Sequence, residues 1–294
     1  MPEWTVRVAR PVVAAGRRHS LVLRRDGTVF CAGEGAADAC LVQDWDDIVS
    51  VAAGNVHAAA NTGRSHSVGL RADGTVLATG WNADGQCDVA AWRGVTGIAA
   101  GWRRTLGLLE DGTVLAAGRQ REGACSVRPW REVVGVTCGD WHSVAARADG
   151  TAVAAGNDRR GQCAVDRWRD VVAVAAGSRH TLALTSSGRV LAAGARSTGA
   201  CEVESWMDVV ETAAGSHHSV GVTTGGRVLA AGSNDRGQCE VAGWRQVVAV
   251  AAGSLHTLGL RADGTVVATG DDGHHPCDVA ARSPASGGRR ARGG

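Results

Sequence analysis

The stretch VVAVAAGSLHTLGLRADGTVVATGDDGHHPCDVA, residues 247–280, decides the fold of this chain. It consists of short segments rich in Val, Leu and Thr, and most of them end at a glycine. Asp263 and Gly264 form a dipeptide typical of the tight turn between two antiparallel strands. Because glycines this frequent break a helix, the stretch predicts four short β-strands, the fourth beginning near Cys277.

The same pattern recurs along the chain with a period of 38 residues. A Gly-x-x-His element marks six copies, at His19, His66, His142, His180, His218 and His256, and Arg104 takes the place of the histidine in the third unit. The first step is 47 residues rather than 38, yet Gly54 and His57 still lie 38 residues after Gly16 and His19. The sequence therefore predicts seven units, with a 9-residue insertion in the second unit, within the stretch from His57 to Ser65.

Seven such units fit radial packing around an axis, because a closed ring protects the edges of every sheet. Helical repeats of similar period need longer segments with a 3.6-residue periodicity, which these units lack. We therefore expect an all-β, seven-bladed β-propeller with four short antiparallel strands per blade, in a single domain over residues 1–282. Residues 283–294 are expected to form a disordered tail rich in Arg and Gly.

Two segments carry a family resemblance: VVAVAAGSRHTLALTSSGRVLAAG, residues 171–194, and the corresponding residues 247–270. Together with the Gly-Gln-Cys that closes units two, four and six, they resemble regulator-of-chromosome-condensation repeats. The resemblance covers about residues 10–280 and implies the propeller fold. It implies no single function, because members of the family include a nucleotide-exchange factor that docks on nucleosomes, an inhibitor of β-lactamases and a plant photoreceptor.

Residues that recur in every unit are expected to serve the architecture, since an active site needs an asymmetric constellation. The histidines are therefore predicted to form structural hydrogen bonds. The periodic cysteines are Cys40, Cys87, Cys125, Cys163, Cys201, Cys239 and Cys277. Their counterparts in neighbouring blades lie too far apart for disulfides, so with Cys31 and Cys138 we expect nine free thiols, no metal and no cofactor.

Six tryptophans follow the periodic cysteines by five residues and are predicted to pack between blades: Trp45, Trp92, Trp130, Trp168, Trp206 and Trp244. The seventh unit has Arg282 at this position. Trp4 lies upstream of the first unit, and a circular fold must join its ends. We therefore expect residues 3–9 to pack beside blade seven and to supply the missing tryptophan.

Charge and hydropathy limit the location and the partners. The net charge of +2 is too small to predict a polyanionic partner for the whole molecule. No apolar run is long enough to span a membrane, and the first residues, MPEWTVRVAR, lack a secretory hydrophobic segment. The expected location is the cytoplasm, with no membrane association.

The loops between strands one and two and between strands three and four emerge on the same face of a meander, and there the units differ most. We call this side the loop face. In blades two to four it gathers tryptophans and arginines outside the periodic series: Trp81, Trp102, Arg103, Arg119, Arg121, Trp141, Arg159 and Arg160. Tryptophan and arginine are enriched at interface hot spots, so these residues are predicted to bind a partner. Blades one and seven contribute acidic residues to the same face: Glu34, Asp38, Asp271 and Asp272.

The sequence therefore favours a non-catalytic scaffold that binds an unknown protein. No nucleophile elbow or nucleotide-binding glycine motif is present. An enzyme or small-molecule binder is the alternative, with an axial pocket lined by His57, Arg104, His274 and His275. A second alternative is weak nucleic-acid binding through Arg289, Arg290 and Arg292 of the tail.

Overall fold

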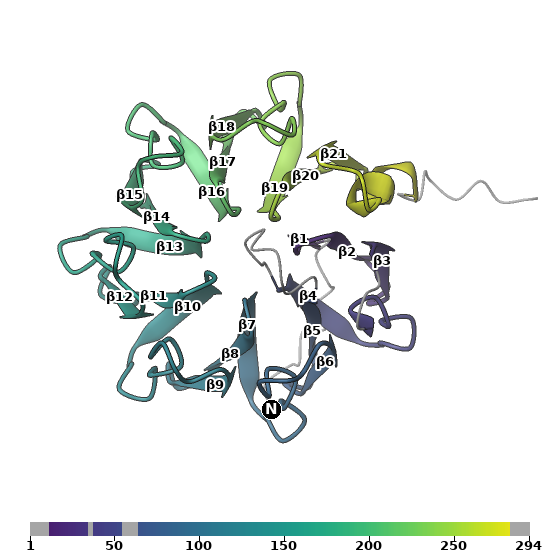
Figure 1. The fold of residues 1–294 in the computed structure, drawn as a ribbon, viewed down its shortest axis with the longest axis vertical. Helices are drawn as coiled ribbons and strands as arrows, with labels where there is room; N and C mark the ends of the chain where they lie inside the picture. The colour runs from purple at the N-terminus through teal and green to yellow at the C-terminus, as the bar shows by residue number, and fades with distance from the viewer. Residues whose placement is uncertain (1–11, 35–37, 55–63, 283–294) are drawn as a thin grey trace, which may run out of the picture.

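The computed structural model describes residues 12–34, 38–54 and 64–282. These residues form seven three-stranded antiparallel sheets arranged in a ring (Figure 1). The predictions of an all-β fold and of seven blades are confirmed. Trp4, the insertion after His57 and the Arg/Gly tail lie outside the described residues. In the part of the chain that is described, no helix is long and apolar enough to cross a membrane.

Each blade turns its first strand toward the axis and its third strand toward the periphery (Figure 1). The inner strands are β1 (Val12–Ala15), β4 (Ile48–Ala53), β7 (Val95–Gly101), β10 (Val133–Cys138), β13 (Val171–Ala176), β16 (Val209–Ala214) and β19 (Val247–Ala252). The middle strands are β2 (His19–Leu23), β5 (His66–Arg71), β8 (Arg104–Leu109), β11 (His142–Arg147), β14 (His180–Thr185), β17 (His218–Thr223) and β20 (His256–Arg261). The outer strands are β3 (Val29–Gly33), β6 (Val76–Gly80), β9 (Val114–Gly118), β12 (Ala152–Gly156), β15 (Val190–Gly194), β18 (Val228–Gly232) and β21 (Val266–Gly270).

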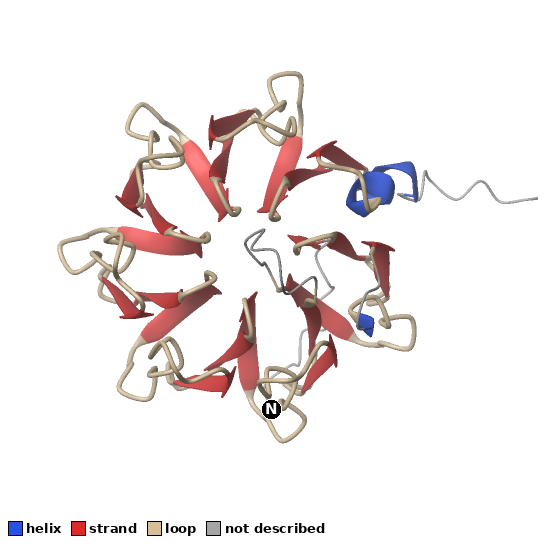
Figure 2. Cartoon of the chain, viewed as in Figure 1, coloured by secondary structure: helices blue, strands red, loops and turns tan. Residues whose placement is uncertain are grey.

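The prediction of a fourth strand in each blade is wrong. Among the described residues, those that follow the outer strands form turns, and in blade seven they include the 3-10 helix η2 (Pro276–Arg282), drawn in blue in Figure 2. Polar side chains bind the backbone of these segments locally. Asn82 Oδ1 accepts a hydrogen bond from the Cys87 amide, and Asp158 Oδ1 accepts one from the Cys163 amide, both at 2.7 Å. Amides satisfied in this way are not available to a sheet ladder.

The periodic tryptophans pack between neighbouring blades, as predicted. Trp45 shares a buried cluster with Leu21 and Leu23 of blade one and with Ile48 of blade two. Its ring also occupies the space beside Gly69, where an added Cβ would lie 2.7 Å from Trp45 Cε3. Trp206 likewise packs with Leu182 and Leu184 of blade five and Val209 of blade six. The hydrophobic core therefore lies at the junctions between blades.

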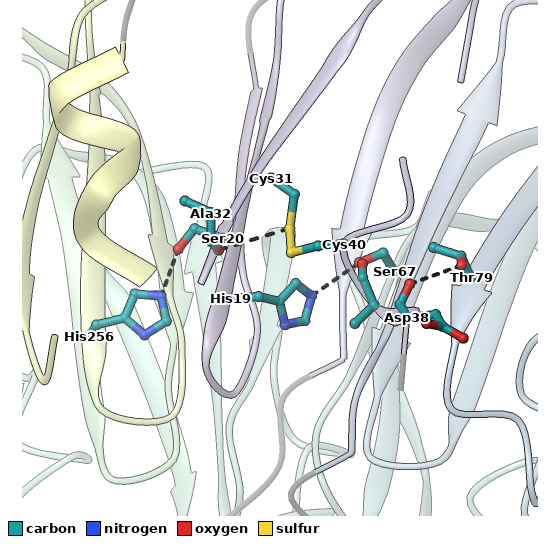
Figure 3. The surroundings of a disulfide bond; sticks show 10 residues. His19, Ser20, Cys31, Ala32, Asp38, Cys40, Ser67, Thr79 and His256 are labelled. Carbon is teal, nitrogen blue, oxygen red and sulfur yellow. Dashed lines mark hydrogen bonds between the residues drawn. A yellow bond between two sulfur atoms is a disulfide. The ribbon is translucent and has the colours of Figure 1, made fainter. Parts of the chain in front are cut away.

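Buried histidines also join each blade to the next, which confirms their predicted structural role. The Nε2 atom of His142 lies 2.7 Å from the Thr181 hydroxyl of the following blade. The equivalent pairs are His19 with Ser67, His66 with Thr105, His180 with Ser219, His218 with Thr257 and His256 with Ser20. Figure 3 shows the pairs on both sides of blade one. The pairs run around the whole ring, interrupted only at blade three.

The hydroxyl of Thr181 fixes the tautomer of the histidine that contacts it. Thr181 donates its single proton to the Gln162 carbonyl oxygen at 2.7 Å, so it can only accept from His142. His142 therefore donates from Nε2. Burial, together with nearby Arg104 and His180, lowers the pKa of His142 to about 3, so the ring is neutral at neutral pH.

Arg104 replaces the histidine in blade three and is almost completely buried. Its Nε donates to the Ser143 hydroxyl at 3.2 Å, and its Nη2 donates to the carbonyl oxygens of Gly139 and His142 at 2.6 and 2.9 Å. Three bonds to blade four thus take the place of one histidine bond. Since its side chain is used in this way, Arg104 is unavailable to the axial ligand site that was the alternative expectation.

Cys31 and Cys40 form a disulfide within blade one, so the prediction of nine free thiols is wrong (Figure 3). Their Cα atoms lie 5.4 Å apart. The prediction considered the periodic cysteines of neighbouring blades, whereas Cys31 belongs to the same blade as its partner. The corresponding position in β15 and β18 is occupied by Ala192 and Ala230. The free cysteines are Cys87, Cys125, Cys138, Cys163, Cys201, Cys239 and Cys277.

Candidate partner-binding face

Three tryptophans and two arginines of blades two to four form one cluster on the loop face. The rings of Trp102 and Trp141 meet edge to face, with centroids 4.4 Å apart and planes inclined by 66°. The Arg103 guanidinium lies 4.6 Å from the ring centroid of Trp81 and 4.3 Å from that of Trp102. Arg119 lies 5.4 Å from the Trp102 ring. All of these distances fall within the range of cation–π attraction. We call these five residues the tryptophan–arginine cluster.

The backbone of Arg103 explains how the cluster forms. The ladder between β7 and β8 extends to the pair Gly101 and Arg104, which leaves a two-residue turn of Trp102 and Arg103. In that turn Arg103 has a φ of 64°, in the left-handed region. The other described non-glycine residues with positive φ occupy positions that repeat from blade to blade. The turn of blade three is therefore a local exception to the repeat, and a bulky residue in this conformation is typical of functional surfaces.

Two acidic residues neutralise the cations of the cluster. Asp84 Oδ2 lies 3.3 Å from Arg103 Nη1, and Arg119 Nε donates to Glu122 Oε2 at 2.9 Å. The indole Nε1 of Trp102 is buried, and no described residue accepts its hydrogen bond. A cluster whose charges are already paired presents chiefly aromatic surface to a partner.

The remaining predicted site residues separate into two groups. Arg159 and Arg160 lie outside the cluster, but they line a pocket that Trp141 shares. The pocket has a volume of about 300 Å³ and is lined by Trp141, Asn157, Arg159, Arg160, Gln162 and Arg179. Arg121 is exposed, and none of the ring contacts of the cluster includes it. The structure therefore brings together seven of the eight predicted residues in two adjoining features that meet at Trp141.

Five residues on this face were not among the predicted site residues: Asp84, Glu122, Asn157, Gln162 and Arg179. A signal for Arg179 was present, because it follows Trp141 by 38 residues and so occupies the same place in its own blade. Asp84 and Glu122 had no comparable signal. They pair with Arg103 and Arg119, and this pairing depends on the directions of the arginine side chains.

Of the acidic residues predicted on blades one and seven, Glu34 is paired within the chain. Glu34 Oε2 lies 2.8 Å from Arg18 Nη1 and 3.3 Å from His274 Nδ1. The hydrogen bond from Arg18 lowers the pKa of Glu34, so this carboxylate is charged and paired at neutral pH. Asp38 and Asp272 are exposed.

Seven blades of one repeat, joined by interblade hydrogen bonds around an axis, define a seven-bladed β-propeller. The Regulator of chromosome condensation (RCC1) repeat matches residues 12–36, 59–86, 95–124, 133–162, 171–198, 209–238 and 247–275. The chain belongs to this repeat family. No curated protein sequence matches it significantly.

Solved structures with similar folds support the propeller architecture. Human WBSCR16 shares 19% identity over 85% of this chain and 86% of its own, with a TM-score of 0.67. Prp20p from Saccharomyces cerevisiae, described with its binding properties to Gsp1p and histones, shares 18% identity over 82% of this chain and 80% of its own, with a TM-score of 0.64. Yeast RCC1 (Prp20) in a structure with bound Kap60 gives 19% identity over 79% and 71%, with a TM-score of 0.61. At these identities the likeness concerns the fold alone.

Proposed function

We propose that this propeller is a non-catalytic scaffold that binds a protein partner through the loop face of blades two to four. The observation that carries the proposal is the stack of Trp81, Arg103, Trp102 and Trp141. Each of these side chains is only partly buried, and each departs from the repeating pattern. Aromatic and arginine anchors of this kind dominate the binding energy of protein interfaces.

Structural relatives support a protein as the partner. Prp20p is described as binding Gsp1p and histones, and Kap60 is seen bound to yeast RCC1. Those partners belong to those proteins. For this chain we propose only that it too binds a protein, because a rigid ring displays variable loops on one face while its core stays constant.

Site-specific photo-cross-linking tests which face the partner contacts. A photoreactive amino acid is placed at Arg121, which is exposed on the loop face, or at Glu110, which is exposed beside a tight turn on the opposite face of the same blade. We expect cross-linked partner only from position 121. Cross-links from position 110 alone would overturn the proposal, and so would an absence of cross-links from both positions in a native lysate.

A further inference from the structure

Two pockets on the loop face occupy equivalent places in the ring. One lies between blades seven and one, and its lining includes Arg18, Leu255 and His274. The other is the pocket between blades four and five described above, where Arg179, Trp141 and Arg160 hold the corresponding positions. Because each residue of one site has a counterpart at the same repeat position in the other, the two sites can be compared residue by residue.

A carboxylate of the chain contacts two of the residues that line the pocket between blades seven and one. Glu34 Oε2 lies 2.8 Å from Arg18 Nη1 and 3.3 Å from His274 Nδ1. One carboxylate thus bridges Arg18 and His274.

The junction between blades two and three also holds a carboxylate, at a different position of the repeat. Arg103 corresponds to Arg179, and Asp84 corresponds to Arg160. The Arg103 guanidinium lies 3.3 Å from the Asp84 carboxylate, so this junction also pairs its arginine with a carboxylate of the chain itself.

Between blades four and five the carboxylates are missing. The position of Glu34 is taken by Ala195, and the position of Asp84 is taken by Arg160. Among the described residues, the guanidinium groups of Arg159, Arg160 and Arg179 take part in no ion pair. The site therefore gathers three cations where its counterparts hold a bridged or paired charge.

The local structure keeps this pocket positive. Asp158, the acid nearest in sequence, is turned to the Cys163 amide, from which its Oδ1 accepts a hydrogen bond at 2.7 Å. The loop itself is fixed, because Asn157 Oδ1 accepts from the Arg159 amide and Gln162 Oε1 accepts from the Arg160 amide, each at 2.9 Å. Like charges held together without an internal anion favour binding of an external one.

We propose that the pocket between blades four and five binds a carboxylate side chain supplied by an acidic segment of the protein partner. At both corresponding sites of this chain a carboxylate pairs with the arginine, Glu34 with Arg18 and Asp84 with Arg103. The inference rests on the proposed function and extends it. Trp141 lines the pocket and also contacts Trp102, so the acidic segment and the residue that packs on the tryptophan–arginine cluster belong to one partner.

A peptide titration tests this inference, together with a variant that places a carboxylate of the chain itself beside the pocket. The probe is the blocked peptide acetyl-Glu-Glu-Glu-amide, its control is acetyl-Gln-Gln-Gln-amide, and binding is followed by tryptophan fluorescence of the full chain. Ala195→Glu restores the carboxylate that Glu34 provides in blade one. Ser233→Glu places the same charge at the equivalent position one blade further on, where His217 stands in place of Arg179.

We expect the triglutamate peptide to bind, more weakly as salt is raised, and the triglutamine peptide not to bind. Ala195→Glu should weaken triglutamate binding by about tenfold or more, whereas Ser233→Glu should leave it nearly unchanged. An unchanged melting temperature shows that both variants are folded. Equal binding of the two peptides, no binding of triglutamate, or an unaffected Ala195→Glu variant would each overturn the inference.

Two further measurements are needed. One distinguishes a carboxylate from other anions, and the other distinguishes failure of this inference from failure of the proposed function. Inorganic phosphate and a short single-stranded oligonucleotide are titrated in the same way, and binding of either without binding of triglutamate overturns the carboxylate assignment. If Trp102→Ala abolishes capture of the partner while triglutamate does not bind, this inference fails and the proposed function stands. If triglutamate binds at Arg160 and Arg179 but Trp102→Ala keeps the partner, the pocket stands and the tryptophan–arginine cluster is not the anchor.

Discussion

The Nε2 atom of His256 lies 3.0 Å from the Ser20 hydroxyl, although the two residues are 236 positions apart in the chain. Beside them the Ser254 amide donates to the Gly16 carbonyl oxygen at 3.1 Å. Blade seven thus meets blade one through the same contacts that join blades four and five. The ring is closed by a repetition of its internal junctions.

Replacing Ser20 by Ala should weaken this closure. The substitution leaves the buried Nε2 atom of His256 without its hydrogen-bond partner, which costs about 1–3 kcal/mol. Urea unfolding of the variant measures the loss. Ser219→Ala is the matched comparison inside the ring, and its cost should be at least as large because Ser219 also donates to the Ala200 carbonyl oxygen. If Ser219→Ala is destabilising and Ser20→Ala is not, the first and last blades are not joined in solution.

The histidine ring should make stability depend on pH between about 6.5 and 3. Burial lowers the pKa of His180 to about 4 and that of His256 to about 3, and the other four buried histidines behave alike. As the pH falls through 6.5, the unfolded chain takes up protons that the folded chain excludes, so stability is lost. Each histidine contributes a slope of up to about 1.4 kcal/mol per pH unit.

The measurement is the free energy of unfolding in urea at several values between pH 7.5 and pH 5. Aspartates such as Asp73 and Asp111, whose pKa is lowered by hydrogen bonds from a neighbouring threonine, affect stability only at lower pH and do not confuse this range. His180→Gln should reduce the slope by about one histidine's share. A free energy that stays constant over this range would contradict a ring of neutral, buried histidines.

The disulfide predicts how many thiols are free. In denaturant without reductant, seven cysteines should react with a thiol reagent, and nine should react after reduction. Under native conditions the reaction should be slow, because burial raises the pKa of Cys138 to about 11 and that of Cys87 to about 12. Mass spectrometry of the unreduced digest should find Cys31 linked to Cys40. Nine reactive thiols before reduction would show that this bond does not form.

The blades could be predicted from sequence because each repeated residue meets the same surroundings in every unit. His142 and His180 differ by one period and contact the hydroxyls of Thr181 and Ser219 in the same way. The fourth strand could not be predicted correctly, since a short segment such as that around Cys163 has the composition of a strand. Its conformation depends on whether Asp158 or a neighbouring strand satisfies the amide.

The candidate site could be predicted only in part. Trp81, Trp102 and Trp141 were recognised because they break the repeat, and the ring places them on adjoining blades. The sequence could not predict which arginines form ion pairs, because the directions of their side chains depend on the conformation of a two-residue turn. Arg103 is paired with Asp84, whereas Arg160 is left without an ion-pair partner among the residues described.

The most direct test of the account compares partner capture by two variants. The triple variant Trp102→Ala, Arg103→Ala, Trp141→Ala removes the centre of the tryptophan–arginine cluster, and Trp130→Ala removes a periodic tryptophan that is only 3% exposed. We expect the triple variant to melt close to the wild type and to lose its partner, as each anchor contributes on the order of 2 kcal/mol. Trp130→Ala should instead lower stability by about 3–5 kcal/mol. If the triple variant keeps its partner, or unfolds as readily as Trp130→Ala, the division between a repeating architecture and a deviating binding face is wrong.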